Sequence, residues 1–379
     1  MNHCKYYPQC GGCISREQEK EAYRKEKYAS FRRTISHINQ QVIEFGEPRF
    51  IDDGLRRRAT LNFSYLKKQF ILGFNEAKSH SIINCEKCLL LTEKLNKNLS
   101  NIARLTHSIC EEPYSVKKGK KIIRQGITGG DVSLCEADNG IDVLFEMSFE
   151  AELNHRLIIS ELASSMDDII RISWHTPQMK VPETLFEKTR PIIKNSGINV
   201  YIPAGTFLQA SREGEQVLIE LVLKYIGNRT GRIADLFCGV GTFSYPLSQN
   251  KKNKIVSIDS SVELLGGFKQ SINANQITNI SIEAKNLFKY PLDEKELENI
   301  DIVVIDPPRA GASAQITKIA QSLNGPQVIV AISCNPNTFV NDANILLNNG
   351  YTLKEITMVD QFVYSNHTEL VALFEKETR

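Results

Sequence analysis

The sequence predicts an α/β protein with a C-terminal doubly wound sheet, preceded by a cysteine-rich segment and an α+β middle region. Three observations predict this arrangement. From about residue 210 onward, short apolar runs alternate with helical stretches, an order typical of a parallel sheet covered by helices. Three cysteines lie within the first 13 residues. Between these two parts, strand-like runs and turns alternate less regularly, with at least one helix.

Individual elements follow from hydrophobic periodicity. In the middle region we expect a helix over 89–105, where leucines recur at helical spacing, a glycine-rich turn over 126–131 and a strand over 141–148. The expected C-terminal strands are 232–236, 254–258, 280–284, 301–305, 327–333, 351–359 and 369–374. The expected domains are residues 1–45 (cysteine-rich segment and helix), 46–205 (α+β region) and 206–379 (doubly wound domain).

The composition suits a soluble globular protein. Of 379 residues, 41% are hydrophobic and 24% are charged. No apolar run is long enough to span a bilayer, and the N-terminus lacks the apolar core of a signal peptide. We therefore expect a cytoplasmic protein, monomeric and without an obligate protein partner. Nine cysteines, an odd number, favour metal binding or catalysis over disulfides in that compartment.

The charge is distributed unevenly along the chain. Residues 1–130 contain 24 Lys and Arg against 13 Asp and Glu, a net charge of +11, whereas the remainder carries −9. The basic part predicts a polyanionic partner. Within it, Arg56, Arg57 and Arg58 precede a strand-like run and are expected to contact phosphates. The alternative is that these arginines pair with carboxylates such as Asp52 and Asp53.

A glycine-containing loop follows the first C-terminal strand and predicts a nucleotide-cofactor site. Gly239 and Gly241 allow a tight turn and a close approach to a ligand. Position 244 is Ser, so the third glycine of a dinucleotide fingerprint is missing. Asp235 would repel phosphate but could hold a positively charged ligand, and Asp259 ends the next strand, where a carboxylate can accept bonds from ribose. These features favour S-adenosylmethionine over NAD.

Cys334 stands at the end of an apolar run and directly before a helix-starting Asn-Pro pair. Ligands of open α/β sheets bind at the carboxyl ends of the strands. Helix N-terminal amides lower a thiol pKa, so we expect a reactive thiolate. The alternative is a buried cysteine that fills core space.

Two carboxylates are expected near this thiol. Asp306 follows the fourth strand in a D-P-P-R sequence, and Glu369 begins the last strand. Arg309 stands where an aromatic residue would be expected for methylation of an adenine amine.

Carbon 5 of uracil becomes nucleophilic only after a thiolate adds to carbon 6, and its proton must later be removed by a base. Cys334 could supply the thiolate, Glu369 the base and Asp306 a hydrogen bond to the uracil edge. For Glu369 the alternative is a surface carboxylate entering a strand.

These residues lie in five motifs that occur in the order expected for one known family. Over nearly its whole length the chain resembles the S-adenosylmethionine-dependent RNA 5-methyluridine (uracil-C5) methyltransferases. The matching segments are Phe207-Leu208-Gln209, Asp235 to Gly241, Asp306-Pro307-Pro308-Arg309, Ser333-Cys334-Asn335-Pro336, and Asp360-Gln361-Phe362 with His367 and Glu369.

The resemblance implies a C-terminal class I, Rossmann-like methyltransferase domain. It implies that Cys334 is the nucleophile, Glu369 the base and Asp306 a catalytic partner. The cofactor-binding residues that it implies are Phe207, Gln209, Asp235, Gly239, Gly241, Asp259 and Asp306. Two positions depart from the family pattern, with Asp259 where Glu is usual and Ser211 where Asn is usual. The first shortens the reach to the ribose, and the second changes one polar contact.

The early cysteines Cys4, Cys10 and Cys13 have the spacing C-x5-C-x2-C, and Cys85 and Cys88 form a distant C-x2-C. Four thiolates of this kind could bind zinc or an iron–sulfur cluster. The resemblance implies a [4Fe-4S] cluster, as in the ribosomal-RNA branch of the family. It also implies Cys88 rather than Cys85 as the fourth ligand, because Cys88 directly precedes a Leu-rich stretch. A structural role is expected, and a redox role stays open.

The implied cluster also bears on the substrate. The transfer-RNA branch of the family generally lacks such a cluster, so we expect 23S rRNA, with tRNA as the alternative. A uridine within a stem must be exposed or flipped to reach Cys334. Two other hypotheses stay open from the sequence: an enzyme that methylates an RNA amine or adenine, with Cys334 structural, and a non-catalytic RNA-binding protein that holds a metal cluster.

Overall fold

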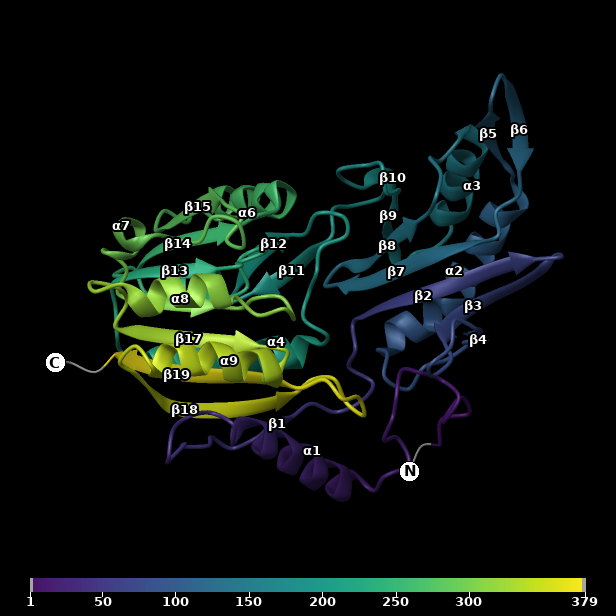
Figure 1. The fold of residues 1–379 in the computed structure, drawn as a ribbon. Helices are drawn as coiled ribbons and strands as arrows, with labels where there is room; N and C mark the ends of the chain where they lie inside the picture. The colour runs from purple at the N-terminus through teal and green to yellow at the C-terminus, as the bar shows by residue number, and fades with distance from the viewer. Residues whose placement is uncertain (1–2, 377–379) are drawn as a thin grey trace. The chain divides into compact units, whose positions relative to one another are not determined.

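The computed structural model describes residues 3–376, which fold into two compact units (Figure 1). Unit 1 contains the described residues up to 17, together with 53–193 and 201–211. Unit 2 contains 18–52, 194–200 and the described residues from 212 onward. The expected division at 45/46 and 205/206 is therefore replaced by a chain that crosses between the units several times. Residues 18–45 pack with the doubly wound sheet rather than with the early cysteines.

Unit 2 is built on an eight-stranded sheet in the order β1-β18-β19-β17-β16-β13-β14-β15. All pairings are parallel except those of β19, which runs antiparallel to both of its neighbours. Its strands are β1 (Arg49–Phe50), β13 (Arg232–Leu236), β14 (Lys254–Asp259), β15 (Ile280–Ala284), β16 (Ile302–Ile305), β17 (Val328–Ser333), β18 (Tyr351–Asp360) and β19 (Glu369–Lys376). The seven C-terminal strands predicted from the sequence are confirmed.

The central strands explain why this sequence forms a covered sheet. Every residue of β16 and β17 is buried, as expected for parallel strands with helices on both faces. Helix α9 begins at Pro336, a favoured first position, and Asn335 caps it by accepting a hydrogen bond from the Asn337 N–H. The helices of this unit are α1 (Lys20–Ile35), α4 (Arg212–Ile226), α5 (Ser244–Ser248), α6 (Val262–Ala274), α7 (Glu294–Leu297), α8 (Ser313–Gln321) and α9 (Pro336–Leu347).

Helix α1 joins unit 2 through one side. Its buried residues Tyr23, Lys27, Phe31 and Ile35 recur every four positions, so they form a single stripe along the helix. Phe31 and Ile35 enter the hydrophobic core of the doubly wound sheet. The other sides of the helix are charged and mostly exposed.

Unit 1 contains a seven-stranded sheet in the order β10-β9-β8-β7-β2-β3-β4. The expected helix over 89–105 is present as α2 (Glu93–Glu111), shifted toward the C-terminus because Thr92 caps it, and the expected strand over 141–148 is β8. The elements of this unit are β2 (Arg58–Leu66), β3 (Gln69–Asn75), β4 (Ile82–Asn84), α2, β5 (Tyr114–Lys118), β6 (Lys121–Gln125), β7 (Gly129–Ala137), β8 (Gly140–Glu146), α3 (Leu153–Ser164), β9 (Ile169–His175) and β10 (Glu183–Glu187).

Two small sheets complete the description. Strands β5 and β6 pair only with each other, and so do β11 (Ile192–Asn195) and β12 (Ile198–Tyr201), which lie where the chain passes between the units. None of the described helices combines the length and the apolar character needed to cross a membrane.

Candidate active site

Strand β13 carries a buried acidic residue near its carboxyl end, just before the glycine-containing loop. Asp235 is 0% exposed, and its Oδ2 accepts a hydrogen bond of 2.5 Å from the Ser244 hydroxyl. Its Oδ1 has no hydrogen-bond partner among the described residues. Burial raises the pKa of Asp235 to about 7. An acceptor left in this state, at the carboxyl end of a central strand, suits a ligand that brings positive charge or an N–H group.

The two glycines of this loop are required for different structural reasons. Gly241 has φ +94°, and a Cβ there would lie 2.5 Å from the Phe268 ring, so glycine permits close packing against α6. Gly239 has φ +55°, and a Cβ there would meet nothing within 4 Å. The loop tip is therefore left-handed backbone facing open space, which a cofactor can approach closely.

Asp259 closes the cofactor loop from the neighbouring strand. Its Oδ2 accepts a hydrogen bond of 3.0 Å from the Gly239 N–H, and its Oδ1 accepts one of 2.9 Å from the Ser261 N–H. Because β13 and β14 are parallel, their carboxyl ends meet at one edge. The structure thus brings together four of the predicted cofactor residues: Asp235, Gly239, Gly241 and Asp259.

The predicted catalytic residues meet at this same edge. β17 and β19 run antiparallel with Ser333 opposite Leu370, so Cys334 lies next to Glu369, the first residue of β19. Asp306 follows β16, the parallel neighbour of β17. The Asn335 side chain donates a hydrogen bond of 3.1 Å to the Arg309 carbonyl, which ties the nucleophile loop to the D-P-P-R loop.

Both carboxylates in this group are buried and difficult to ionise. Glu369 is 2% exposed, and burial raises its pKa to about 7, against the opposing effects of Gln361 and Arg309. Burial, together with the nearby charges of Glu369 and Asp235, raises the pKa of Asp306 well above its usual range. One proton shared by this pair is therefore expected near neutral pH.

The expectation of a lowered thiol pKa at Cys334 is wrong. Burial, followed by the charges of Glu369 and Asp306, raises the pKa of this thiol to about 11, and Arg309 offsets only part of the effect. The helix does not compensate, because Cys334 precedes the cap and the Asn335 side chain already engages the Asn337 N–H. The thiol of the free protein is therefore protonated at neutral pH.

Phe207 and Gln209, predicted to bind the cofactor, belong to unit 1. The Phe207 side chain is 60% exposed, and the Arg58 guanidinium lies 4.0 Å from its ring centroid. Gln209 is buried. Their role at the cofactor, which requires the two units to meet, stays a prediction.

A network that sequence reasoning missed supports the last motif. The Tyr23 hydroxyl of α1 donates a hydrogen bond of 2.6 Å to Asp360 and accepts one of 2.8 Å from the Tyr364 N–H. The Lys27 ammonium donates to the carbonyls of Ser365 and His367, at 2.5 and 2.7 Å. Helix α1 therefore holds the loop that leads to Glu369. The four-residue spacing of its buried stripe was the available signal.

The arginine triplet does not form a phosphate-contacting surface as expected. Arg57 is only 3% exposed, and its Nε donates to the Gln209 carbonyl at 3.1 Å. Arg58 donates to the Leu208 carbonyl, and Arg56 donates to the Arg58 carbonyl. Of the two carboxylates named in the alternative, Asp53 pairs with Arg16, and Asp52 pairs with Lys20 and Arg24. These arginines instead satisfy backbone carbonyls inside unit 1.

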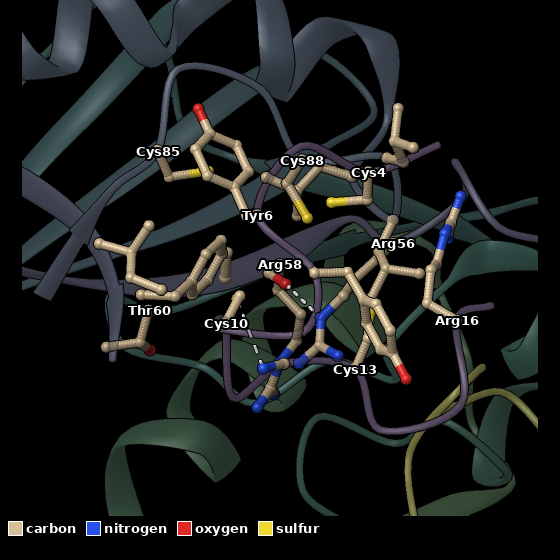
Figure 2. Close-up of a pocket in the computed structure, with 18 residues that line it drawn as sticks. Cys4, Tyr6, Cys10, Cys13, Arg16, Arg56, Arg58, Thr60, Cys85 and Cys88 are labelled. Atoms are coloured by element: carbon tan, nitrogen blue, oxygen red, sulfur yellow. Dashed lines mark hydrogen bonds between the residues drawn. The ribbon is translucent and has the colours of Figure 1, made fainter. Parts of the chain in front are cut away.

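The early cysteines of unit 1 share one cavity of about 260 Å³, drawn in Figure 2. Its walls also carry Arg16, Arg56 and Arg58 and several aromatic and aliphatic side chains. The cysteines that line it are Cys4, Cys10, Cys13, Cys85 and Cys88. Among residues 3–376, however, no three His, Cys, Asp or Glu side chains come together as a group that could hold a metal ion.

The electrostatics of the cavity distinguish the two later cysteines. Burial raises the pKa of Cys13 to about 12. Neighbouring thiols raise it further, and the contribution of Cys88 is larger than those of Cys10 and Cys4. The pKa of Cys88 is also raised by burial, but the backbone N–H groups of Leu90 and Leu91 favour its thiolate. Cys88 therefore lies near the early cysteines, and two backbone N–H groups offset part of the cost of burying its thiolate.

The fold and this edge of the sheet define a class I, S-adenosylmethionine-binding methyltransferase domain. Comparison with known proteins then gives the family. The family model of tRNA (uracil-5-)-methyltransferases matches residues 186–377. An uncharacterized RNA methyltransferase of Agrobacterium fabrum is 32% identical over 376 residues, which cover 97% of this chain and 82% of that protein. The chain belongs to the tRNA (uracil-5-)-methyltransferase family and is an S-adenosylmethionine-dependent RNA (uracil-C5) methyltransferase.

Two further matches extend this comparison. The 23S rRNA (uracil(1939)-C(5))-methyltransferase of Aliivibrio fischeri is 27% identical, with 98% of this chain and 82% of that protein covered. The crystal structure of Pyrococcus abyssi tRNA (uracil-54, C5)-methyltransferase in complex with S-adenosyl-L-homocysteine has a TM-score of 0.71 at 22% identity. The match covers 97% of this chain and 86% of the Pyrococcus abyssi chain, so the two proteins share the same fold.

Proposed function

We propose that this enzyme methylates carbon 5 of a uridine in 23S rRNA through a covalent bond between Cys334 and carbon 6. The observation that carries the proposal is the strand register that puts Cys334 beside Glu369 at the edge where Asp235 and Asp259 form the cofactor loop. Support for 23S rRNA comes from the relative in Aliivibrio fischeri, whose name states that substrate. A tRNA uridine is the alternative.

The raised pKa values suggest how protons move. The Cys334 thiol must lose its proton as sulfur adds to carbon 6, and this proton passes to water, because Asp306, whose pKa is raised further than that of Glu369, is already protonated. Protonated Asp306 then donates a hydrogen bond to the uracil oxygen that becomes an enolate. S-adenosylmethionine, bound at Asp235 and Asp259, supplies the methyl group that carbon 5 attacks.

The second half of the reaction restores the enzyme. Glu369, ionised in part near neutral pH, removes the proton from carbon 5, and the electron pair left there expels the Cys334 sulfur from carbon 6. The thiolate recovers a proton from water, and Glu369 releases its proton to water. Asp306 thus acts as a hydrogen-bond donor and Glu369 as a base, and their raised pKa values suit these two tasks.

The covalent step is tested with RNA in which 5-fluorouracil replaces uracil. Fluorine at carbon 5 does not leave as a proton does, so the wild type should form an adduct that survives a denaturing gel. Cys334→Ser should form none and should lose methyl transfer while binding S-adenosylmethionine normally. Cys135→Ser, which replaces a thiol of the other unit, is the matched control. Substantial turnover by Cys334→Ser would remove this thiol from the mechanism.

The choice of RNA is tested separately. Total RNA from cells that lack the gene is incubated with the enzyme and S-adenosylmethionine carrying a labelled methyl group, and the label is mapped. Label in 23S rRNA supports the proposal, whereas label confined to tRNA establishes the alternative.

We further propose a [4Fe-4S] cluster held by Cys4, Cys10, Cys13 and Cys88. The support is that these four cysteines line one cavity, whose arginines offset the negative charge of a thiolate cluster. The Cys88 thiolate also has the backbone N–H contacts that cluster sulfurs use. The cluster would join residues 4–13 to residues 85–88 of the same unit. The cytoplasmic location and the monomeric state stay predictions.

A further inference from the structure

The two-stranded ribbon of β5 and β6 is a feature that the mechanism does not use. It pairs with no other described strand, and Figure 1 shows it extending from unit 1 beyond α3 and the seven-stranded sheet. Its sequence, from Tyr114 to Gln125, contains four lysines around a single glycine turn. An appendage of this kind adds little to the core of its unit, so its composition calls for another explanation.

The lysines of the ribbon are not neutralised within the protein. Lys117, Lys118, Lys120 and Lys121 are all exposed, and none forms an ion pair with another residue of the described chain. Lys118 stands directly opposite Lys121 in the strand register. Like charges in opposed positions destabilise a hairpin, so the arrangement favours an external anion. Four charges therefore gather at the free end of the ribbon.

The base of the ribbon, in contrast, is held firmly. Arg124 donates to Glu152 at 2.5 Å and also to the Pro113 carbonyl. The Ser115 N–H donates to the other Glu152 oxygen at 2.6 Å. The Tyr114 ring stacks on Phe149, with 3.9 Å between centroids. The ribbon thus presents its charged tip from a fixed anchor, which reduces the entropy lost on binding.

We infer that the β5–β6 ribbon docks on the phosphate backbone of double-helical RNA that adjoins the target uridine. The inference rests on the proposed function, because it assigns a surface for that RNA. Lysine is a compact point charge without the geometry that reads a base. The only aromatic ring on the ribbon, Tyr114, is already stacked, so no platform is offered for unpaired bases. Duplex RNA, recognised by shape and backbone, fits this surface better than a single strand.

The test compares two pairs of substitutions that each remove two charges. Lys118→Gln/Lys121→Gln alters the ribbon, and Lys251→Gln/Lys252→Gln alters exposed lysines before β14, at the strand ends away from the cofactor loop. Binding is titrated at several salt concentrations against an RNA hairpin with a loop uridine and against an unpaired RNA of the same length. Unchanged binding of S-adenosylmethionine confirms that each variant is folded.

The ribbon variant should bind the hairpin about 10-fold more weakly at low salt. The slope of log Kd against log salt concentration should fall by roughly 1 to 2, since each lost phosphate contact lowers that slope by about 0.9. Unpaired RNA should be affected little, and the control variant should match the wild type. Hairpin binding equal to that of the control would overturn the inference. So would an equal loss on both RNAs, or an equal loss of binding to anionic lipid vesicles.

The two proposals fail in different ways. Methyl transfer to unpaired uridine RNA should keep its kcat in the ribbon variant, because Cys334 and Glu369 are untouched. If the wild type methylates no uracil in any RNA, the proposed function fails, whereas the hairpin titration still decides whether the ribbon binds duplex RNA.

Discussion

The Gln361 side-chain amide donates a buried hydrogen bond of 2.7 Å to the Glu369 carboxylate. This bond favours the ionised carboxylate and so opposes the larger effect of burial on the same group. The pKa of the proposed base is therefore held near neutral pH by burial, which raises it, and by Gln361 and Arg309, which lower it; Gln361 lies eight positions away in the same motif.

This relationship predicts the pH dependence of methyl transfer. Glu369 acts as a base only when ionised, and its pKa is raised to about 7, so single-turnover rates should rise as pH increases through about 7. Gln361→Met removes the hydrogen bond that lowers this pKa, and the midpoint should move to higher pH. The profile is measured with saturating RNA and S-adenosylmethionine. A midpoint that does not move would exclude this bond as a determinant of the pKa.

Glu369→Gln should block proton removal from carbon 5. The amide keeps the shape of the side chain but is not a base, so turnover should fall about 10² to 10⁴-fold and a methylated covalent adduct should accumulate. Denaturing gels with labelled methyl groups detect that adduct. Glu375→Gln on the same strand, which affects an ion pair with Arg229, is the control and should turn over normally. Turnover by Glu369→Gln without an adduct would assign the base to another group.

Tyr23→Phe should impair catalysis from helix α1. The substitution removes one hydroxyl, leaving Asp360 without its 2.6 Å donor and the Tyr364 N–H without its acceptor. Each buried polar group left unpaired costs about 1 to 3 kcal/mol, so the loop before Glu369 should lose order. We expect a lower kcat, with the Kd for S-adenosylmethionine unchanged. Tyr28→Phe on the same helix is the matched control.

The Tyr23 result is read through the pH profile as well. If the loop positions Glu369, Tyr23→Phe should change the midpoint or the plateau of the pH profile. If the substitution only lowers stability, it should reduce the amount of folded enzyme and leave the profile of the folded enzyme unchanged. Wild-type kinetics in Tyr23→Phe would show that the network serves the fold rather than the base.

Anaerobically purified protein should contain four iron atoms per chain and be brown, because the four proposed ligands are thiolates. Cys88→Ser should lose iron, and Cys85→Ser should retain it, since the Cys88 thiol adds first among the thiols to the raised pKa of Cys13. Iron analysis and visible absorption measure both results. Stoichiometric zinc without iron would contradict the cluster, and the reverse pattern in the two variants would make Cys85 the ligand.

Much of the active site could be predicted from the sequence for a simple reason. In a parallel sheet the carboxyl ends of all strands meet at one edge, so residues that follow apolar runs are brought together without knowledge of the packing. Asp235, Asp259 and Asp306 were placed correctly in this way. Glu369 lies at the start of its strand, and it reaches the same edge because β19 is antiparallel to its neighbours.

Tertiary structure alone decided how the charges behave. The sequence suggested a reactive thiolate at Cys334 and phosphate contacts for the arginines at 56–58. In the folded protein, burial raises the pKa of the thiol, and the arginines donate to backbone carbonyls. Likewise, Tyr23 and Asp360 are 337 positions apart in the chain. Local patterns specify which strands and helices form and where they end. Desolvation and contacts between distant residues depend on what packs around each group, and that is determined only when the whole chain has folded.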